Sequence, residues 1–435
     1  MAKRLTALLR LYRLLSVAVA PFAPLLLAQR LRRGKELRER LRERRGEPTA
    51  DRPVGPLIWI HGASVGEISC VVPLIEQFAS HQTEVLVTSG TVTSAALAKQ
   101  RMPRGVTHQF IPLDVPGYVR RFLDHWQPDL TLLVESDLWP NIILENSARG
   151  VPLILVNGRV SDSSFRTWLR FPRSIGNLLD RFDLCLARTP EDATRLRELG
   201  APRIVTTGNI KLDVPAPPAN DKALAALRAA IGSRPVIAAA STHPGEEIDV
   251  VAAHRMLRSK FPGVLTLIAP RHPERGAAVA QIASAAGLKA VLRSQSQLPD
   301  PETEIYVADT LGELGLLYRL APVVFMGGSL VRHGGQNPIE PAKLGAALVH
   351  GPHVSNFRDI YAALDDVGGA QEITDASTLA LRIAGWLADP TSRAHAANAG
   401  RVTVETQSGA LQRTLSALEP YLMQLRLHAR GQHHA

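Results

Sequence analysis

The sequence predicts an α/β protein made of two doubly wound domains that follow an apolar N-terminal segment. From Leu57 onward, short and almost continuously apolar strands alternate with longer helical stretches, a pattern typical of parallel sheets covered on both faces. The strand-loop-helix sequence IWIHGASVGE at 58–67 is echoed by VIAAASTHPGEE at 236–247. A proline-rich stretch at 211–221, KLDVPAPPAND, predicts a linker between two domains of similar plan.

Composition excludes several classes of protein. The chain has 435 residues, a hydrophobic content of 45% and 32 glycines, which fits a globular protein with two substantial cores. Its two cysteines, Cys70 and Cys185, lie far apart, which argues against a disulfide framework or a structural zinc site and suits a reducing compartment. The net charge of +10 indicates an anionic partner, but the chain contains no nucleic-acid-binding motif.

The N-terminal segment predicts a membrane anchor, and we assign residues 1–49 to this anchor and the basic stretch behind it. Residues 14–29 are apolar but short for a full span, and Pro21 and Pro24 interrupt them. Residues 30–45 hold nine lysines and arginines, a cluster that does not normally follow a signal peptide. We expect the anchor to span the membrane or to lie in its interface, with the nine basic side chains on anionic lipid headgroups. The alternative is an amphipathic helix packed on the following domain.

The strands divide into two groups along the chain. Those expected in the first domain are 57–61, 84–89, 130–135, 152–158 and 182–187, and those in the second are 235–241, 264–270, 304–309 and 322–328. We place the first domain at 50–212 and the second domain, with a terminal helix, at 213–435. Ligands of such open sheets bind beyond the carboxyl ends of the strands, so we expect the functional residues of both domains to face a cleft.

The loop after the first expected strand ends on Glu67. A carboxylate in the first turn of a helix is favoured by the helix dipole, so Glu67 is explained as a cap on the helix that follows. The alternative is a catalytic base held at the mouth of a parallel sheet. The loop sequence alone leaves both interpretations open.

Polar residues follow other strands of the first domain. Glu135 and Asp137 could bind a divalent cation, cap a helix, or stabilise charge that develops in a reaction. Asn157 and Arg159 form either a polar wall for a sugar or phosphate acceptor or a capped turn. Lys211, just before the linker, is either a solvated lysine or a group that meets a developing negative charge.

The second domain carries features typical of a phosphate site. Arg271 follows a strand and could bind phosphate through its guanidinium fork or form a surface salt bridge, and residues 312–313 lie at an expected helix start. Residues 325–345 contain two Gly-Gly pairs, which allow close approach of the backbone to a ligand. Asn337 is expected as an N-cap and Pro338 as the first helical residue, so this helix N-terminus is predicted to bind a nucleotide phosphate.

Eight motifs in order resemble those of a known family. They are ASVGE, ESDLWPN, NGRVS, GNIKLD, ASTHPGEE, PRHPER, DTLGEL and GGSLVRHGGQNPIEP. With these motifs the whole chain resembles the 3-deoxy-D-manno-octulosonic acid (Kdo) transferases of lipopolysaccharide assembly. The resemblance implies a glycosyltransferase fold of the B type, in which two Rossmann-like domains face a cleft, together with a single N-terminal membrane anchor helix.

The resemblance also implies an activity, which is inverting transfer of Kdo from CMP-Kdo to a lipid A precursor of the lipid IVA type. It implies no metal ion and no other cofactor. The partners would be CMP-Kdo, the lipid A precursor and membrane lipids, at the bacterial inner membrane with the catalytic domains on the cytoplasmic side. Two other functions stay open, namely transfer from another nucleotide sugar and binding of anionic lipid without catalysis.

The resemblance assigns roles to individual residues. Glu67 would be the catalytic base, and Glu135 and Lys211 would stabilise the transition state. The residues expected on the acceptor side of the cleft are Ser64, Gly66 and Arg159. The expected CMP contacts are Pro270, Arg271, Leu311, Gly312, Glu313, Asn337, Pro338, Ile339 and Glu340.

Three positions depart from the family pattern. Asp137 and Gln336 replace a usual glutamate and a usual histidine, and Pro244 stands where glutamate is common. None of them falls on the base or on the principal CMP contacts, so they bear on donor or acceptor fit rather than on the reaction class. CMP leaves with less charge than a nucleoside diphosphate, so we interpret Glu135 and Asp137 as groups other than metal ligands.

Overall fold

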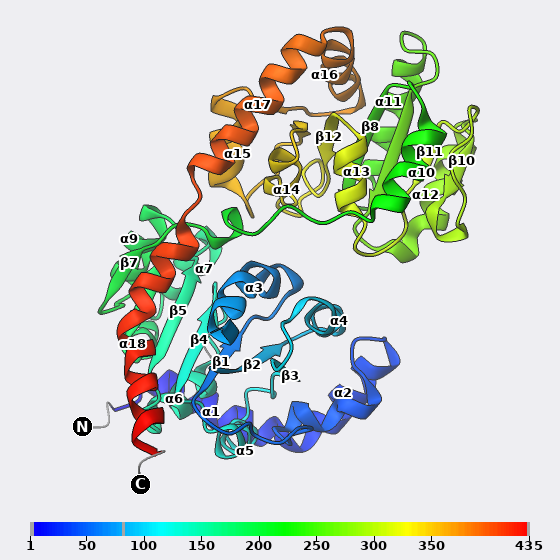
Figure 1. Ribbon diagram of the computed structural model, residues 1–435. Coiled ribbons are helices and arrows are strands. Elements are labelled where there is room, and N and C mark those ends of the chain that lie inside the picture. The colour runs from blue at the N-terminus through cyan, green and yellow to red at the C-terminus, as the bar shows by residue number, and fades with distance from the viewer. Residues whose placement is uncertain (1–3, 81–82, 433–435) are drawn as a thin grey trace. The chain divides into compact units, whose positions relative to one another are not determined.

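The computed structural model describes residues 4–80 and 83–432 and divides into two compact units, each built around one parallel sheet (Figure 1). Unit 1 comprises Met1–Val214 and Ser408–Ala435, and unit 2 comprises Pro215–Gln407. The α/β class with two parallel sheets is confirmed.

The sheet of unit 1 has seven parallel strands in the order β3-β2-β1-β4-β5-β6-β7. Their bounds are β1 Leu57–His61, β2 Glu84–Ser89, β3 Thr107–Phe110, β4 Leu130–Val134, β5 Leu153–Gly158, β6 Leu184–Ala187 and β7 Ile204–Thr206. Alternate residues of β1 enter different cores, because Leu57 and Trp59 pack on one face of the sheet and Ile58 and Ile60 on the other. The sheet is therefore apolar on both faces, which explains the continuous hydrophobic runs in its central strands.

Helices cover this sheet and connect its strands. They are α3 Val65–Ser80, α4 Val92–Arg101, α5 Pro116–Trp126, α6 Pro140–Ala148, α7 Asp162–Trp168, α8 Pro172–Leu179, α9 Pro190–Glu198, the short 3-10 helix η3 Ile210–Leu212 and the terminal helix α18 Ala410–Gln432. All strand pairs are parallel, and helical crossovers connect strands that follow each other in the chain, so every strand ends at the same edge of the sheet.

Unit 2 repeats this plan with seven parallel strands in the order β10-β11-β9-β8-β12-β13-β14. Their bounds are β8 Val236–Thr242, β9 Leu265–Pro270, β10 Ala290–Leu292, β11 Ile305–Val307, β12 Val323–Met326, β13 Ala347–His350 and β14 Ala370–Glu372. The helices are α10 Asp221–Ile231, α11 Glu246–Arg258, η4 Pro273–Arg275, α12 Gly276–Ala285, η5 Arg293–Gln295, α13 Leu314–Leu320, α14 Ile339–Lys343, α15 Arg358–Asp366, α16 Ala376–Ala388 and α17 Pro390–Thr406. All nine strands expected from the sequence are present.

The terminal helix belongs to the first unit, although the sequence analysis placed it with the second. Leu418 and Leu422 of α18 lie in the core beside β1, and α18 contacts α3 and η3 (Figure 1). The carboxylate of Asp213 accepts hydrogen bonds from the backbone N–H of Gly409 and Leu411, at 2.5 and 2.7 Å, and so ties the start of α18 to the linker. The placement of residues 408–435 in the second domain is therefore corrected.

The apolar N-terminal segment is helical. It consists of α1 Ala7–Val19, the 3-10 turn η1 Ala20–Phe22 and α2 Ala23–Arg32. Among the described residues, Ala7–Arg32 is the one stretch long and apolar enough to cross a membrane, judged by length and composition.

The basic stretch behind it is partly an interior element of unit 1. The 3-10 helix η2, Arg38–Arg45, buries Glu43 and Arg44. Glu43 accepts the backbone N–H of Phe110 at the end of β3, at 2.6 Å, and Arg44 donates to the carbonyl oxygen of Gly90, at 2.6 Å. The expectation that all nine basic side chains contact lipid is therefore wrong for Arg44, which is buried in unit 1 and donates to the carbonyl oxygen of Ile111, just after β3. Burial lowers the pKa of Arg44, and its ion pair with Glu36 opposes that effect.

Candidate active site

Glu67 lies in the first turn of α3, directly beyond β1. Its carboxylate accepts hydrogen bonds from the hydroxyl of Ser64 and from the backbone N–H of Ala63, both at 2.8 Å. The Ser64 oxygen in turn accepts the backbone N–H of Glu67 at 3.3 Å. Glu67 thus caps its helix in a reciprocal arrangement, which holds the carboxylate at one place on the edge of the sheet.

Glycines make this loop compact. A Cβ on Gly62 would lie 3.1 Å from the Cβ of Glu67, and a Cβ on Gly90 would lie 2.9 Å from the carbonyl oxygen of Ala63. That oxygen accepts the N–H of Gly90 at 3.1 Å, which joins the β1 loop to the β2 loop. The loop that carries Glu67 is therefore packed closely against the start of α3 at Gly62 and against the β2 loop at Gly90.

Glu135 directly follows β4 and has an unusual backbone conformation. Its φ of 62° lies in the left-handed region, which is unfavourable for residues other than glycine and persists where surrounding structure enforces it. The side chain is 8% exposed and forms an ion pair with Lys211 of η3. The ion pair holds this largely buried carboxylate beside Lys211.

Asn157 joins the two partners of this ion pair. It ends β5 with a φ of 54° and is fully buried. Its Nδ2 donates to Glu135 at 3.4 Å, and its Oδ1 accepts the backbone N–H of Ile210, beside Lys211, at 3.1 Å. From the sequence, Asn157 was expected in a polar wall or a capped turn, and this positioning role was not predicted. The signal was an asparagine at a strand end, a residue that tolerates positive φ.

The carboxylates of this edge influence one another. Burial raises the pKa of Glu67, and the negative charges of Glu135 and Asp137 raise it further, whereas the hydrogen bonds from Ser64 and Ala63 lower it. The structure therefore brings Glu67, Glu135 and Lys211 together at the carboxyl edge of one sheet. A carboxylate with a raised pKa accepts a proton more readily than an ordinary one.

Asp137 has a different partner from Glu135. Its Oδ2 lies 3.3 Å from Nε2 of His61, the last residue of β1, and Nδ1 of His61 lies 2.9 Å from the hydroxyl of Thr88. The sequence analysis missed His61, although a histidine that ends an apolar strand was a visible signal. Among the described residues there is no group of three or more His, Cys, Asp or Glu that could hold a metal ion.

The expected acceptor-side residues lie around the same edge. Ser64, just before α3, and Gly66, in its first turn, are exposed, and Arg159 is half-buried directly after β5. The backbone N–H of Arg159 donates to the carbonyl oxygen of Glu135 at 3.4 Å.

In unit 2, one buried carboxylate holds the glycine-rich loop after β12. Glu246, at the start of α11, accepts the backbone N–H groups of Gly328, Ser329 and Leu330 at 2.7 to 3.0 Å. It also accepts the N–H of His243, at 2.8 Å. Glu246 is fully buried. Its role in holding this loop was not predicted, because in the sequence it is simply the first glutamate of a Gly-Glu-Glu helix entry.

The segment from Asn337 to Glu340 forms a short helix entry. The Asn337 side chain accepts the backbone N–H of Ile339 at 3.1 Å and donates to Glu340 at 3.3 Å. Helix α14 begins at Ile339 with Pro338 as its cap, one residue later than expected. The correction follows from the Asn337 side chain, which closes a turn before the helix rather than capping the helix itself.

Glu313 is held by a bidentate ion pair. Its two oxygens accept from Arg293 at 3.0 and 2.9 Å, and it also accepts from the hydroxyl of Thr310. The bonds from Arg293 lower the pKa of Glu313. The neighbouring Leu311 is 75% exposed and Gly312 has a φ of 80°, so this loop presents backbone and an apolar side chain outwards.

A cluster of bases adjoins the β8 and β9 ends. Arg271 directly follows Pro270 and is exposed. Its backbone N–H donates to the carbonyl oxygen of Thr242. The His243 ring stacks on His333 with centroids 4.2 Å apart. Burial lowers the pKa of His243 to about 4, helped by the neighbouring His333, His272 and Arg271. His243 is therefore neutral near pH 7, and the fixed positive charge in this cluster is that of Arg271.

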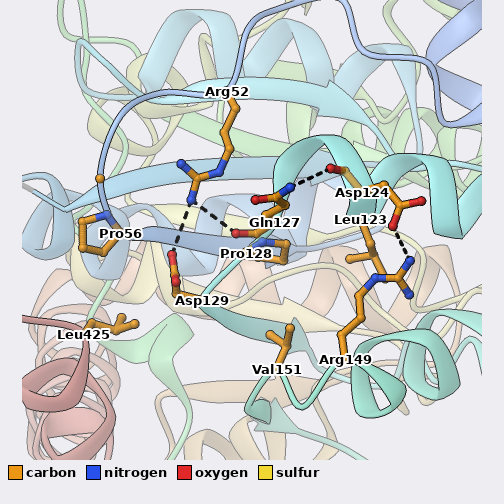
Figure 2. A pocket seen from close by; sticks show the side chains of 11 residues that line it. Arg52, Pro56, Leu123, Asp124, Gln127, Pro128, Asp129, Arg149, Val151 and Leu425 are labelled. Carbon is orange, nitrogen blue, oxygen red and sulfur yellow. Dashed lines mark hydrogen bonds and ion pairs between the residues drawn. The ribbon is translucent and has the colours of Figure 1, made fainter. Parts of the chain in front are cut away.

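A cavity of about 600 Å3 lies at the other edge of the unit 1 sheet (Figure 2). Its walls include Pro56 before β1 and Val151 before β5, and its charged residues are paired, Arg52 with Asp129 and Arg149 with Asp124. Because parallel strands present their ligand sites at their carboxyl ends, this hollow is not the expected place for the reaction.

Comparisons with known proteins agree with this architecture. Residues 37–214 match the family model described as 3-Deoxy-D-manno-octulosonic-acid transferase (kdotransferase). The chain is 34% identical over 395 residues to the 3-deoxy-D-manno-octulosonic acid transferase of Haemophilus influenzae, covering 88% of this chain and 92% of that one. It is 37% identical to the Bordetella pertussis transferase of the same name, over 86% of this chain and 89% of that one.

Among solved structures, a putative UDP-N-acetylglucosamine 2-epimerase from Listeria monocytogenes has the same fold. It aligns with a TM-score of 0.59 and 13% identity, over 85% of this chain and 98% of that one. The relatives, unlike this distant structure, are similar enough in sequence to show the family. The chain belongs to the family of 3-deoxy-D-manno-octulosonic acid transferases and is a glycosyltransferase.

Proposed function

We propose that the protein transfers Kdo from CMP-Kdo to a lipid A precursor of the lipid IVA type, with inversion at the anomeric carbon and without a metal ion. The reaction takes place on the cytoplasmic side of the bacterial inner membrane. The observation that carries this proposal is the set of Glu67, Glu135 and Lys211 at one sheet edge, in a chain that belongs to the Kdo transferase family.

Glu67 is the base in this mechanism. An inverting transfer needs one group that removes the proton of the attacking hydroxyl, on the face opposite the leaving nucleotide. Its hydrogen-bonding partners, Ser64 and Ala63, fix the carboxylate, and its raised pKa matches it to an alcohol better than an ordinary glutamate. Ser64, Gly66 and Arg159 line the acceptor side.

Glu135 and Lys211 stabilise the charges of the transition state. Positive charge develops on the sugar ring and negative charge on the departing phosphate, so a fixed pair of opposite charges can serve both. Asn157 holds both members in place, and little reorganisation is then needed during the reaction.

CMP binds to the carboxyl edge of the unit 2 sheet. Arg271 meets the phosphate, and the contacts to the rest of CMP come from Pro270, Leu311, Gly312, Glu313, Asn337, Pro338, Ile339 and Glu340. The exposure of Arg271 and the open loop at Leu311 support these contacts.

Product analysis tests the proposal. The purified full chain in detergent is given a tetraacyl lipid A precursor with CMP-Kdo, or with UDP- or GDP-sugars as alternative donors. We expect CMP release and a Kdo-modified lipid only with CMP-Kdo, and an anomeric configuration in the product opposite to that of the donor by NMR. Transfer from another nucleotide sugar, or no transfer at all, contradicts the proposal.

Removal of divalent cations should leave turnover unchanged. We expect the same rate of CMP release in EDTA as in magnesium, because Lys211 and Arg271 supply the positive charge near the leaving group. A loss of activity in EDTA that magnesium restores would return Glu135 and Asp137 to the role of metal ligands.

The acid limb of the pH-rate profile should move when Asp137 is neutralised. Glu67 cannot act as a base once it is protonated. Because its pKa is raised above 4.5, the value of an ordinary glutamate, the rate should begin to fall at a pH above that value. Asp137→Asn removes one negative neighbour, so the Glu67 pKa and the acid limb of kcat/KM should shift to lower pH. Asp124→Asn, at the opposite edge of the sheet, is the control and should shift nothing.

Arg271→Ala should weaken donor binding. Charge-assisted bonds to phosphate contribute about 1.5–3 kcal/mol, so the Kd for CMP, measured by calorimetry, should rise by at least about tenfold. Arg255→Ala, an exposed arginine in the last turn of α11, is the matched control and should bind CMP like the wild type. Equal affinities in all three proteins would remove Arg271 from the donor site.

A further inference from the structure

The apolar N-terminal segment is attached to unit 1 through polar side chains. Tyr12 of α1 donates to Oδ2 of Asp114 at 2.9 Å, and Arg13 pairs with Glu145 at 2.5 Å. Leu9 of the same helix is buried in the core of unit 1. Helix α1 is therefore a packed element of the folded unit, and it lies against α5 (Figure 1).

The groups that receive these contacts belong to the interior. Asp114 also accepts two backbone hydrogen bonds from the first turn of α6, and Glu145 projects from the same helix and is buried. On α1, Ser16 accepts a hydrogen bond from buried Asn141, at 3.2 Å. Detaching α1 would remove partners from buried polar groups, which is unfavourable.

The outer face of the segment is apolar, the reverse of a helix on a water-soluble surface. Nine large apolar side chains are 38–70% exposed there, namely Leu8, Leu11, Leu14, Leu15, Val17, Val19, Phe22, Leu25 and Leu26. A contiguous apolar surface of this kind is unfavourable in water and marks a site of association.

Packing, rather than length, opposes a membrane span. The 26 residues of Ala7–Arg32 extend about 39 Å, which exceeds a hydrocarbon core of about 30 Å. Leu9 lies in the core of unit 1 and α1 contacts α5, so with α1 in place the 10 residues of α2 extend only about 15 Å. A continuous span would also pull Arg13 away from Glu145 and into hydrocarbon, where a charged side chain is strongly disfavoured.

We propose that Ala7–Arg32 lies within one leaflet of the bilayer, along its interface, and does not span it. The polar side of α1 stays on unit 1, the apolar side enters the acyl boundary, and the N-terminus remains on the same side of the membrane as the catalytic units. This inference deepens the membrane association in the proposed function by fixing its topology.

The charges of the N-terminal segment favour a lipid surface, rather than an apolar protein, as the partner of its exposed apolar face. Residues 4–35 contain no aspartate or glutamate. The exposed basic side chains Arg10, Arg32, Arg33 and Lys35 flank the apolar face. Apolar residues bordered by arginine and lysine suit the boundary between acyl chains and anionic headgroups.

Cysteine labelling tests the topology. Arg4→Cys and, as a reference in unit 2, Asp366→Cys place exposed thiols on a chain whose own cysteines are buried. We expect a membrane-impermeant maleimide to label both sites in inside-out vesicles and neither in intact spheroplasts. Labelling of Arg4→Cys only from the outside of spheroplasts would show a spanning helix and overturn the proposal. The readout needs no turnover, so it stands apart from any failure of the proposed reaction.

Vesicle partitioning tests the occupant of the apolar face. The triple variant Leu14→Ser, Leu15→Ser, Leu25→Ser should bind phosphatidylglycerol vesicles at least tenfold more weakly than the wild type in flotation. The matched variant Val54→Ser, Leu381→Ser, Val402→Ser changes equally exposed apolar residues elsewhere and should bind normally. Both should keep the wild-type melting temperature, since all six side chains are exposed.

Two outcomes would overturn the assignment to lipid. One is unchanged vesicle binding by the first triple variant. The other is a lipid-free dimer of the wild type that this variant converts to a monomer, which would make the face an interface between copies of the chain.

Discussion

Glu67→Gln should abolish transfer while leaving the affinity for CMP close to that of the wild type. A general base contributes about 10²- to 10⁴-fold to the rate, and glutamine cannot take the proton of the attacking hydroxyl. Glutamine can still accept the hydrogen bonds of Ala63 and Ser64, so the loop should keep its conformation. We expect kcat to fall at least about 100-fold, measured as CMP release with saturating substrates.

The control for this prediction is a second glutamate in the same helix. Glu76 of α3 is exposed and lies three turns from the sheet edge, so Glu76→Gln should keep full activity. Affinity for CMP should be unchanged in both variants, because the proposed nucleotide contacts belong to unit 2. A Glu67→Gln enzyme with more than about a tenth of the wild-type rate would exclude Glu67 as the base.

The central strands were predictable because burial on both faces requires continuous apolar runs. β1, β4 and β5 are of this kind, and their ends were found within one residue. The strands left out of the expected set are short, such as β3, β10 and β14, which lie at or near the edges of the two sheets. An edge strand of three or four residues needs little apolar sequence, so its pattern does not differ from that of a loop.

The site was predictable where a residue follows a strand and unpredictable where its partner is distant in sequence. Glu67, Glu135 and Lys211 were identified from motifs, and the structure gathers them at one edge. Glu246 bonds to a loop more than 80 residues away, and Glu43 bonds to a strand 67 residues away. The sequence around Glu246 and Glu43 does not indicate these distant partners. Both residues therefore resemble ordinary surface or helix-capping glutamates in the sequence.

The same reason explains the misjudged basic stretch. A run of arginines indicates a solvated face, and most members of this one are exposed. Arg44 differs because Glu36 and the carbonyl oxygens of Gly90 and Ile111 surround its guanidinium group. Only the packed fold reveals which arginine of the run is enclosed.

Lys211→Met should destabilise unit 1 as well as stop catalysis. The side chains of Lys211 and Glu135 are 15% and 10% exposed, so the substitution leaves a largely buried carboxylate without its cation. Breaking such a pair costs about 3–5 kcal/mol, far more than breaking a surface pair. Lys289→Met, which disrupts the exposed pairs with Asp300 and Glu302 in unit 2, is the control and should leave the free energy of unfolding close to that of the wild type.

The double variant Glu135→Gln, Lys211→Met should separate the structural role of the pair from its catalytic role. It removes both charges, and the glutamine can keep the hydrogen bond from Asn157, so most of the lost stability should return. Turnover should not return, because the charges that the transition state requires are gone. Urea unfolding followed by tryptophan fluorescence measures the first effect, since four of the five tryptophans lie in unit 1. If Lys211→Met is as stable as the wild type, the ion pair is not a structural element. If the double variant regains activity, the pair only holds the fold, and the charge stabilisation must come from other residues.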